Sequence, residues 1–146
     1  MADSAAAKRD AISASLAAYL GELRLAGHHW ERKPVGSADG EAGWNARQVA
    51  EHIAGAGTFF GSALARTIGA QPIQPQPFQF AIAADAVPAT EAAYQKLLDV
   101  ASQVKDEQLA VEIELPRLGS RTAGGIIDMV AAHLLDHANQ LKSLRT

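Results

Sequence analysis

The chain of 146 residues contains no cysteine. Disulfides, cysteine nucleophiles and zinc sites with cysteine ligands are therefore excluded. Any metal ion that this protein binds must be held by nitrogen or oxygen ligands. If a thiol takes part in its chemistry, that thiol must arrive as a small molecule.

Long basic blocks and long apolar runs are also missing. The 13 Lys and Arg residues are scattered among 16 Asp and Glu residues and the formal net charge is −3, so we do not expect a nucleic-acid partner. The longest weakly polar stretch, residues 53–65, is far shorter than the roughly 20 residues that a membrane span needs. Residues 1–23 lack the pattern of a signal peptide. We therefore expect a soluble, cytoplasmic protein without a membrane partner.

Aromatic residues make up only 5% of the chain, whereas 48% of its residues are hydrophobic and many of these are alanine. Alanine-rich sequences with few β-branched runs favour helix. The length fits one domain, residues 1–146, that is large enough to bury a core.

Apolar residues recur at helical spacing in four segments. The predicted helices cover residues 4–27, 45–69, 88–104 and 122–145, with Ser4 as the first N-cap and the third helix starting at Pro88 or Ala89. Four amphipathic helices are most economically packed as an all-α four-helix bundle with long connections.

The connections carry their own signals. Residues 31–43 contain three glycines and a proline, which predicts a loop. Residues 70–87 begin with a proline-rich part and continue to Phe78 and Phe80, which we expect to anchor this linker over the bundle as a lid or pocket wall. Residues 111–115 alternate like a short strand but have no obvious partner, so the sequence favours an extended crossing there.

The second predicted helix has a well-marked start. Asn45 is a natural N-cap, and Gln48 three residues later completes a capping-box pattern. Trp44 directly precedes the cap, where a hydrophobic staple packs onto the first turn. We expect Trp44 to act as a staple and a lid on the core rather than as a direct substrate contact.

Three glycines, Gly55, Gly57 and Gly61, lie inside the same helix. Each costs about 0.5–1 kcal/mol relative to alanine. Their presence indicates the close approach of another backbone, a partner subunit, or a cavity beside His52.

His133 and His137 lie four residues apart on the apolar face of the last helix. Buried polar groups need partners, and a metal ion is one such partner. Together with His52 from the second helix, they can supply three nitrogens to one divalent ion near one end of the core, which leaves a coordination position open. Neutral imidazole suits Zn, Ni, Fe or Cu. The alternative is three unrelated histidines held by hydrogen bonds in the core.

The remaining candidates surround these histidines in sequence. Gln48 lies four residues before His52, Asp136 three after His133, and Gln140 three after His137, so each could orient an imidazole. Each could equally face solvent.

His28 and His29 follow the first predicted helix near its C-terminus. The helix macrodipole favours histidine at this end, and adjacent histidines point about 100° apart on a helix, which makes a poor chelate. We interpret this pair as electrostatic capping.

Two segments resemble a known family. The run from Trp44 to His52, WNARQVAEH, resembles the tryptophan-to-histidine signature of the DinB/YfiT-like (damage-inducible) metalloproteins, and residues 122–141 resemble their last helix, including the trailing Gln140. The chain departs from the family pattern at three positions. Leu134 stands where an acidic residue is frequent, Asp136 where another histidine is frequent, and Gln48 where many relatives have glutamate.

The resemblance implies a four-helix bundle, often a homodimer, that binds one divalent ion (Zn, Ni or Fe) through His52, His133 and His137. It also implies a reaction, because members of the family include transferases and isomerases that use bacillithiol or mycothiol. The metal lowers the pKa of the thiol, and the thiolate attacks an electrophile.

The function expected from this resemblance is a metal-dependent thiol S-transferase or isomerase with an electrophilic small-molecule substrate. One alternative is a metal-dependent hydrolase, although no carboxylate is obviously placed as its general base. The other is a non-enzymatic stress protein that binds a metal or a small ligand.

Overall fold

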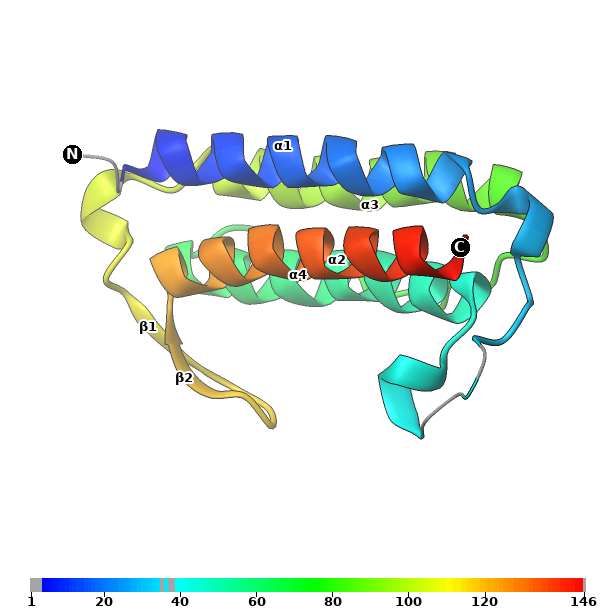
Figure 1. Ribbon diagram of the computed structural model, residues 1–146. Helices are drawn as coiled ribbons and strands as arrows, with labels where there is room; N and C mark the ends of the chain where they lie inside the picture. Colours follow the sequence, from blue (N-terminus) through cyan, green and yellow to red (C-terminus); the bar gives the residue numbers. More distant parts are fainter. Residues whose placement is uncertain (1–3, 35, 37–38, 146) are drawn as a thin grey trace.

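The computed structural model describes residues 4–34, 36 and 39–145. Over these residues the chain is mostly helical, with four long α-helices and one small two-stranded sheet (Figure 1). Three positions of the predicted loop, residues 35, 37 and 38, lie outside the described residues, as do residues 1–3 and 146. The expected all-α class is right for the helices but leaves out the sheet.

Helix α1 (Ala5–Arg24) begins as predicted, because Oγ of Ser4 accepts a hydrogen bond from the backbone N–H of Ala7 at 3.0 Å. The helix ends before the expected Gly27. A 3₁₀ turn, η1 (Gly27–His29), follows it.

Helix α2 (Ala46–Ile68) opens with the predicted capping box. Oδ1 of Asn45 accepts from the backbone N–H of Gln48 at 2.9 Å, and Oε1 of Gln48 accepts from the backbone N–H of Asn45 at 3.0 Å. The helix ends at Gly69, whose φ of +70° suits a residue without a side chain.

Helix α3 (Ala83–Ala101) begins earlier than the predicted start at Pro88 or Ala89, so that prediction was wrong. Pro88 lies inside the helix, where it cannot donate to the carbonyl of Ala84. Both residues are exposed, so water can solvate that carbonyl. Burial of Ala83 and Ala86 then favours helix before the proline.

The prediction of an unpartnered extended crossing at residues 111–115 was also wrong. Strand β1 (Glu112–Leu115) pairs antiparallel with strand β2 (Gly119–Thr122), with Glu112 opposite Thr122 and Leu115 opposite Gly119. Residues 116–118 make the hairpin turn.

Helix α4 (Ala123–Leu144) follows β2 directly. The predicted cap is confirmed, since Oγ1 of Thr122 accepts from the backbone N–H of Gly125 at 3.0 Å.

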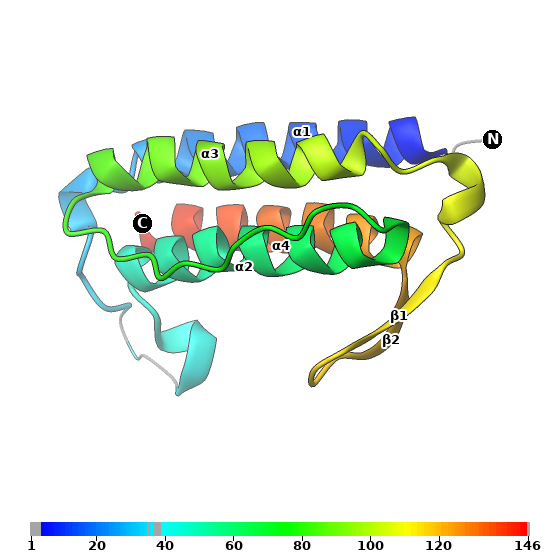
Figure 2. The same ribbon diagram turned by 180° about the vertical axis from the view of Figure 1, so that it is seen from behind.

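Figures 1 and 2 show the helices in two layers, with α1 and α3 in one layer and α2 and α4 in the other. Across the layers, α1 packs against α4 and α2 packs against α3. All four helices contribute to one hydrophobic core. Its largest fully buried side chains include Ile12, Tyr19, Leu23, Ile53, Leu64, Tyr94, Leu97, Ile126, Ile127 and Leu141.

Residues 70–82 link α2 to α3 without helix or strand. Phe80 is buried and Phe78 is half-buried, so both phenylalanines pack on the core as expected. Ile73 adds a third anchor, because its side chain lies beside Gly61 and its carbonyl accepts from Oγ of Ser62 at 2.6 Å.

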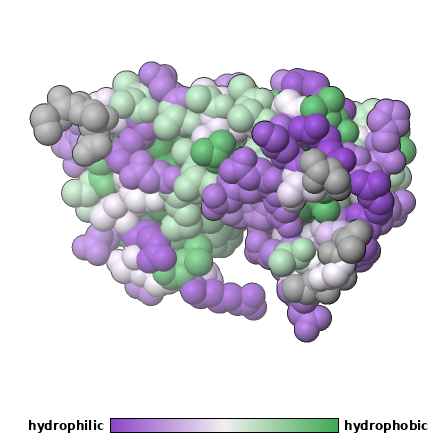
Figure 3. Space-filling view, in the orientation of Figure 1, coloured by the Kyte–Doolittle hydropathy of each residue, from purple (hydrophilic) through white to green (hydrophobic). Residues whose placement is uncertain are grey.

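Among the described residues, no helix is long and apolar enough to cross a membrane. The hairpin and the segment that carries the 3₁₀ turn η2 (Gly40–Gly43) both project from the α2–α4 layer on the side away from α1 and α3 (Figures 1 and 2). The space-filling view shows this face hollowed between two projections (Figure 3).

Candidate metal centre

The ring nitrogens of His52, His133 and His137 converge between α2 and α4. Nε2 of His133 lies 3.0 Å from Nε2 of His52 and 3.1 Å from Nε2 of His137. The ligand atoms that the three residues offer all lie within 4.8 Å of one another. The structure therefore brings together the three histidines that the sequence singled out.

Hydrogen bonds alone cannot account for both of these short nitrogen–nitrogen distances. Oε1 of Gln140 lies 2.7 Å from Nδ1 of His137. Because a carbonyl oxygen only accepts, Nδ1 carries the hydrogen, and Nε2 of the neutral ring has a free lone pair. A single hydrogen on Nε2 of His133 can point well at His52 or at His137, but not at both. A cation among the three nitrogens removes this conflict, since it takes a lone pair from each.

His52 and His133 both have lowered pKa values, which favours their neutral form. Burial, with smaller contributions from the neighbouring His137 and His52, lowers the pKa of His133 to about 4. Burial also lowers the pKa of His52, His137 adds to this effect, and Glu41 opposes it. Neutral imidazole at neutral pH is the protonation state that metal binding requires.

Gln140 connects His137 to the segment before α2. Its Nε2 donates to the backbone carbonyl of Glu41 at 2.7 Å. That carbonyl can only accept, so the amide nitrogen must face Glu41 and Oε1 must face His137. Gln140 thereby orients the imidazole from behind, which is the usual arrangement around a histidine ligand.

Glu41 is a site residue that the sequence did not indicate. It lies on η2, and its Oε1 is 3.6 Å from Nε2 of His137. Its side chain is 59% exposed, so the carboxylate lies at the solvent side of the histidine cluster. This position gives the site an acid or base next to the three nitrogens.

Trp44 covers the cluster from the start of α2. The centroid of its ring system lies 5.0 Å from that of His52 and 6.4 Å from that of His137, and it is nearly parallel to the His137 ring, at 16°. The side chain is half-buried. Trp44 therefore shields two of the three imidazoles from water.

The other two sequence candidates do not contact a histidine. Gln48 is used by the capping box, and its Oε1 also accepts from Nζ of Lys33 at 3.0 Å. Asp136 is exposed and lies in the wall of a cavity beside His133 and His137. Within the described part of the chain it makes no hydrogen bond or ion pair.

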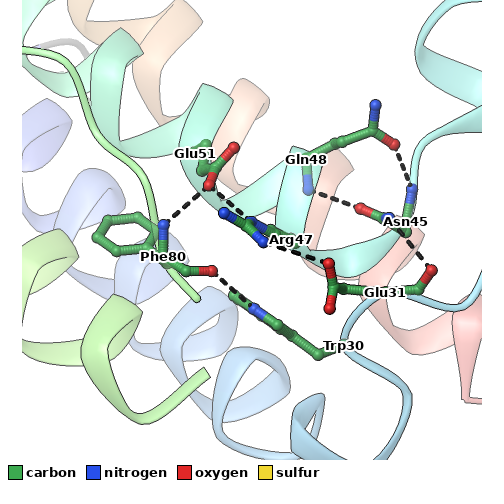
Figure 4. Close-up of polar contacts among 7 residues, drawn as sticks. All are labelled: Trp30, Glu31, Asn45, Arg47, Gln48, Glu51 and Phe80. Carbon is green, nitrogen blue, oxygen red and sulfur yellow. Dashed lines mark hydrogen bonds and ion pairs between the residues drawn. The ribbon is translucent and has the colours of Figure 1, made fainter. Parts of the chain in front are cut away.

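A polar network fixes the helix that carries His52 (Figure 4). Arg47 binds Glu51 at 3.0 Å and Glu31 at 3.2 Å. Oε2 of Glu51 also accepts from the backbone N–H of Phe80 at 2.8 Å, and the Phe80 carbonyl accepts from Nε1 of Trp30 at 2.9 Å. The first turns of α2 are thus tied to the loop after α1 and to the linker before α3.

The smaller of two cavities beside the histidines has a volume of about 450 Å³. Asp136, Gln140 and Ser143 line it together with His133 and His137. Most of its lining residues are therefore polar or charged.

The larger cavity has a volume of about 960 Å³. It extends from His52 and His133 to the turn of the hairpin, and its lining is mainly apolar. Glu41 and His133 line both cavities, so the histidine cluster lies where the two meet. The linker of residues 70–82 lines neither of these two cavities. It does line a separate cavity of about 460 Å³ on α2, through Pro72, Ile73, Pro75 and Gln76, so its expected role as a pocket wall is confirmed away from the histidines.

His28 and His29 lie outside the cluster, on η1. Burial lowers the pKa of His29, and its Nε2 is buried without a hydrogen-bond partner among the described residues. Neither residue contributes to the candidate metal centre.

The three histidines could hold a divalent ion. Nitrogens bound to one zinc ion at about 2.0–2.1 Å lie roughly 3.3 Å apart in a tetrahedral shell, close to the 3.0 and 3.1 Å separations seen here. The lowered pKa values of His52 and His133 and the fixed tautomer of His137 suit the same use. Three protein ligands leave at least one position for a small molecule.

Residues 9–141 match the DinB superfamily. The match spans most of α1, the whole of α2 and α3, and all three histidines of the cluster. Comparison with curated proteins and with solved structures gives no match. The resemblance inferred from the two sequence segments is confirmed, and the chain belongs to the DinB superfamily.

Proposed function

We propose that this chain is a four-helix-bundle metalloenzyme that binds one divalent ion, Zn, Ni or Fe, through His52, His133 and His137. It transfers a low-molecular-weight thiol to an electrophilic small molecule, or isomerises such a molecule with the thiol's help. The observation that carries the proposal is the convergence of three histidine Nε2 atoms where two cavities with different linings meet. Such a junction gives two different molecules access to one centre.

Residues around the metal have separate roles in the proposed reaction. A divalent ion with an open position lowers the pKa of a thiol or of water. The Glu41 carboxylate, 3.6 Å from Nε2 of His137, is placed to accept the released proton. Because the chain has no cysteine, the sulfur must belong to the co-substrate. Trp44 excludes water from one side of the cluster.

A metal-dependent hydrolase is the second candidate, and Glu41 is the observation that favours it. A carboxylate within reach of the centre can act as the general base toward water. The position of Glu41 thus supports this alternative, for which the sequence indicated no general base.

The test uses the purified, metal-loaded protein with a chlorobimane as the electrophile, followed by mass spectrometry. Consumption that needs both the metal and an added thiol (bacillithiol, mycothiol or glutathione) supports the transferase. Turnover of ester or amide probes without thiol supports the hydrolase. Inertness toward the whole panel overturns both and favours a binding protein.

The metal site itself is tested by elemental analysis. His137→Ala removes one of three ligands and is expected to abolish stoichiometric metal, whereas Asn139→Ala, at an exposed position on the same helix, keeps it. Equal metal content in both variants would show that the histidine cluster is not the site. Light scattering on the same samples checks the expected homodimer.

A further inference from the structure

The turn of the β-hairpin forms one wall of the larger cavity. Pro116, Arg117 and Leu118 line this cavity together with His52 and His133. The hairpin precedes α4 and projects from the α2–α4 layer on the same side as η2 (Figures 1 and 2). A ligand in the cavity therefore meets the histidines at one end and the turn at the other.

Arg117 has an unfavourable backbone conformation in this turn. The backbone N–H of Leu118 donates to the carbonyl of Leu115 at 3.2 Å, which closes a four-residue turn with Pro116 second and Arg117 third. The φ of Arg117 is +68°. This pattern is that of a type II turn, whose third position prefers glycine or asparagine. A long side chain held there against its backbone preference points to a use for that side chain.

Arg117 is also a cation without a counter-ion. It makes no hydrogen bond or ion pair with any residue that the structure describes. Of the acidic residues in the lining, Glu51 is already bound by Arg47 and by the Phe80 N–H, and Glu41 lies beside His137. Among the described residues that line the cavity, Arg117 is the only Lys or Arg.

The surface between these polar ends is apolar. Ala56, Phe59, Phe60, Leu118 and Met129 line it. The Phe59 side chain is 39% exposed, so it is open to a ligand in the cavity. An apolar ligand body would cover this surface.

We propose that the larger cavity binds small molecules that combine an apolar body with a carboxylate group. Arg117 pairs with the carboxylate, for which its planar fork of N–H donors is suited, and the apolar body packs on Phe59, Phe60 and Met129. Arg117 is then a specificity-determining residue. The inference rests on the proposed function in one respect, namely that this cavity holds the substrate.

The test compares two probes with the same apolar body, 4-phenylbutyrate and 4-phenylbutanamide, by calorimetric titration of the full, metal-loaded chain. Wild type should bind the carboxylate at least tenfold more tightly than the amide. Arg117→Gln should abolish this preference and Arg117→Lys should keep part of it. Arg121→Gln is the matched control, because Arg121 lies on β2 outside the cavity lining, and should behave as wild type.

Two results would overturn the inference. One is an unchanged carboxylate preference in Arg117→Gln, and the other is a wild type that binds neither probe or binds both equally. Repeating the titration after the metal is chelated separates binding by Arg117, which persists, from binding of the carboxylate at the histidines, which is lost. Metal content measured in the same samples reports on the proposed function independently, since a wild type without stoichiometric metal would contradict that function and not the role of Arg117.

Discussion

At the scale of single residues, Gln140 and Gln48 have the same side chain in two different uses. Both lie a turn away from a histidine of the cluster. Gln140 contacts its histidine and also the Glu41 carbonyl, whereas Gln48 caps α2 and binds Lys33. Removing the Gln140 side chain should therefore affect metal binding, whereas removing the Gln48 side chain should affect the stability of the fold.

Gln140→Ala is expected to weaken metal binding about 10–100-fold, because the Nδ1–H of His137 loses the acceptor that fixes its tautomer and ring orientation. Gln48→Ala should leave metal affinity unchanged and lower the free energy of unfolding by about 1 kcal/mol through the lost half of the capping box. Competition with a chelator measures the first quantity and urea unfolding the second. Equal metal affinity in the two variants would mean that Gln140 does not support the site.

Arg117→Gly is expected to stabilise the protein. Relief of the side chain at positive φ stabilises the folded state by about 1–2 kcal/mol. The greater conformational freedom of glycine in the unfolded chain offsets about 0.5–1 kcal/mol of this, so the net gain in the free energy of unfolding is about 0.5–1 kcal/mol. Arg121→Gly, inside β2, should instead lower stability by a similar amount. Urea midpoints of the two variants check this, and a destabilised Arg117→Gly would show that the turn is not strained by its arginine.

Helical spacing predicted the three histidines of the site but could not predict Glu41. Each histidine belongs to a long helix, and the period of apolar residues shows which face of that helix is buried. Glu41 lies in a short 3₁₀ turn inside a loop. Its approach to His137 depends on a hydrogen bond from Gln140, 99 residues further along the chain, and no sequence period records such a contact.

At the scale of elements, Gly57 sets how closely α2 and α3 approach. A Cβ atom added there would lie 2.9 Å from Cε1 of Tyr94. The Tyr94 ring is buried and its hydroxyl donates to the Ile53 carbonyl at 2.8 Å, so the ring cannot retreat without losing that bond. Of the three helix glycines, Gly57 and Gly61 are thus explained by close packing, Gly61 against Ile73 and Leu97, whereas Gly55 lines the larger cavity.

Gly57→Ala should destabilise the protein by about 1–2 kcal/mol, because overpacking costs more than the gain in helix propensity. Gly55→Ala is the matched control, since nothing lies within 4 Å of its added Cβ. It should stabilise the helix by up to about 0.5–1 kcal/mol. Chemical denaturation of both variants measures the difference, and a stabilised Gly57→Ala would mean that α2 and α3 can separate at little cost.

The elements that sequence reasoning missed are those held by local pairing rather than by burial. Strand β2 has no apolar alternation, and its pairing with β1 follows from the turn at residues 116–118 and from a bond between Ser120 and Glu112. The proline and glycine at positions 116 and 119 were the available signal. The start of α3 was misplaced for a different reason. A proline usually marks the first helical turn, but an exposed proline is tolerated further in, and burial of Ala83 and Ala86 favours helix ahead of Pro88.

At the scale of the whole molecule, the candidate metal centre joins parts of the chain that are distant in sequence. His52 and His133 are 81 residues apart and belong to α2 and α4, which share a layer (Figure 1). Their nitrogens are adjacent only after both helices have packed on the common core. A divalent ion should therefore bind the folded chain far better than the unfolded one.

Binding restricted to the folded state must raise stability by mass action. At a free metal concentration a hundred times the dissociation constant, the gain is about 2.7 kcal/mol, which for a chain of this size corresponds to a rise in Tm of roughly 5–10 °C. The rise should appear on adding Zn or Ni to metal-free protein and should be reversed by a chelator. In His137→Ala the same addition should shift Tm by little, whereas Asn139→Ala should respond as wild type does. A comparable shift in His137→Ala would place the stabilising ion elsewhere on the molecule, because that variant lacks the most buried of the three ligands.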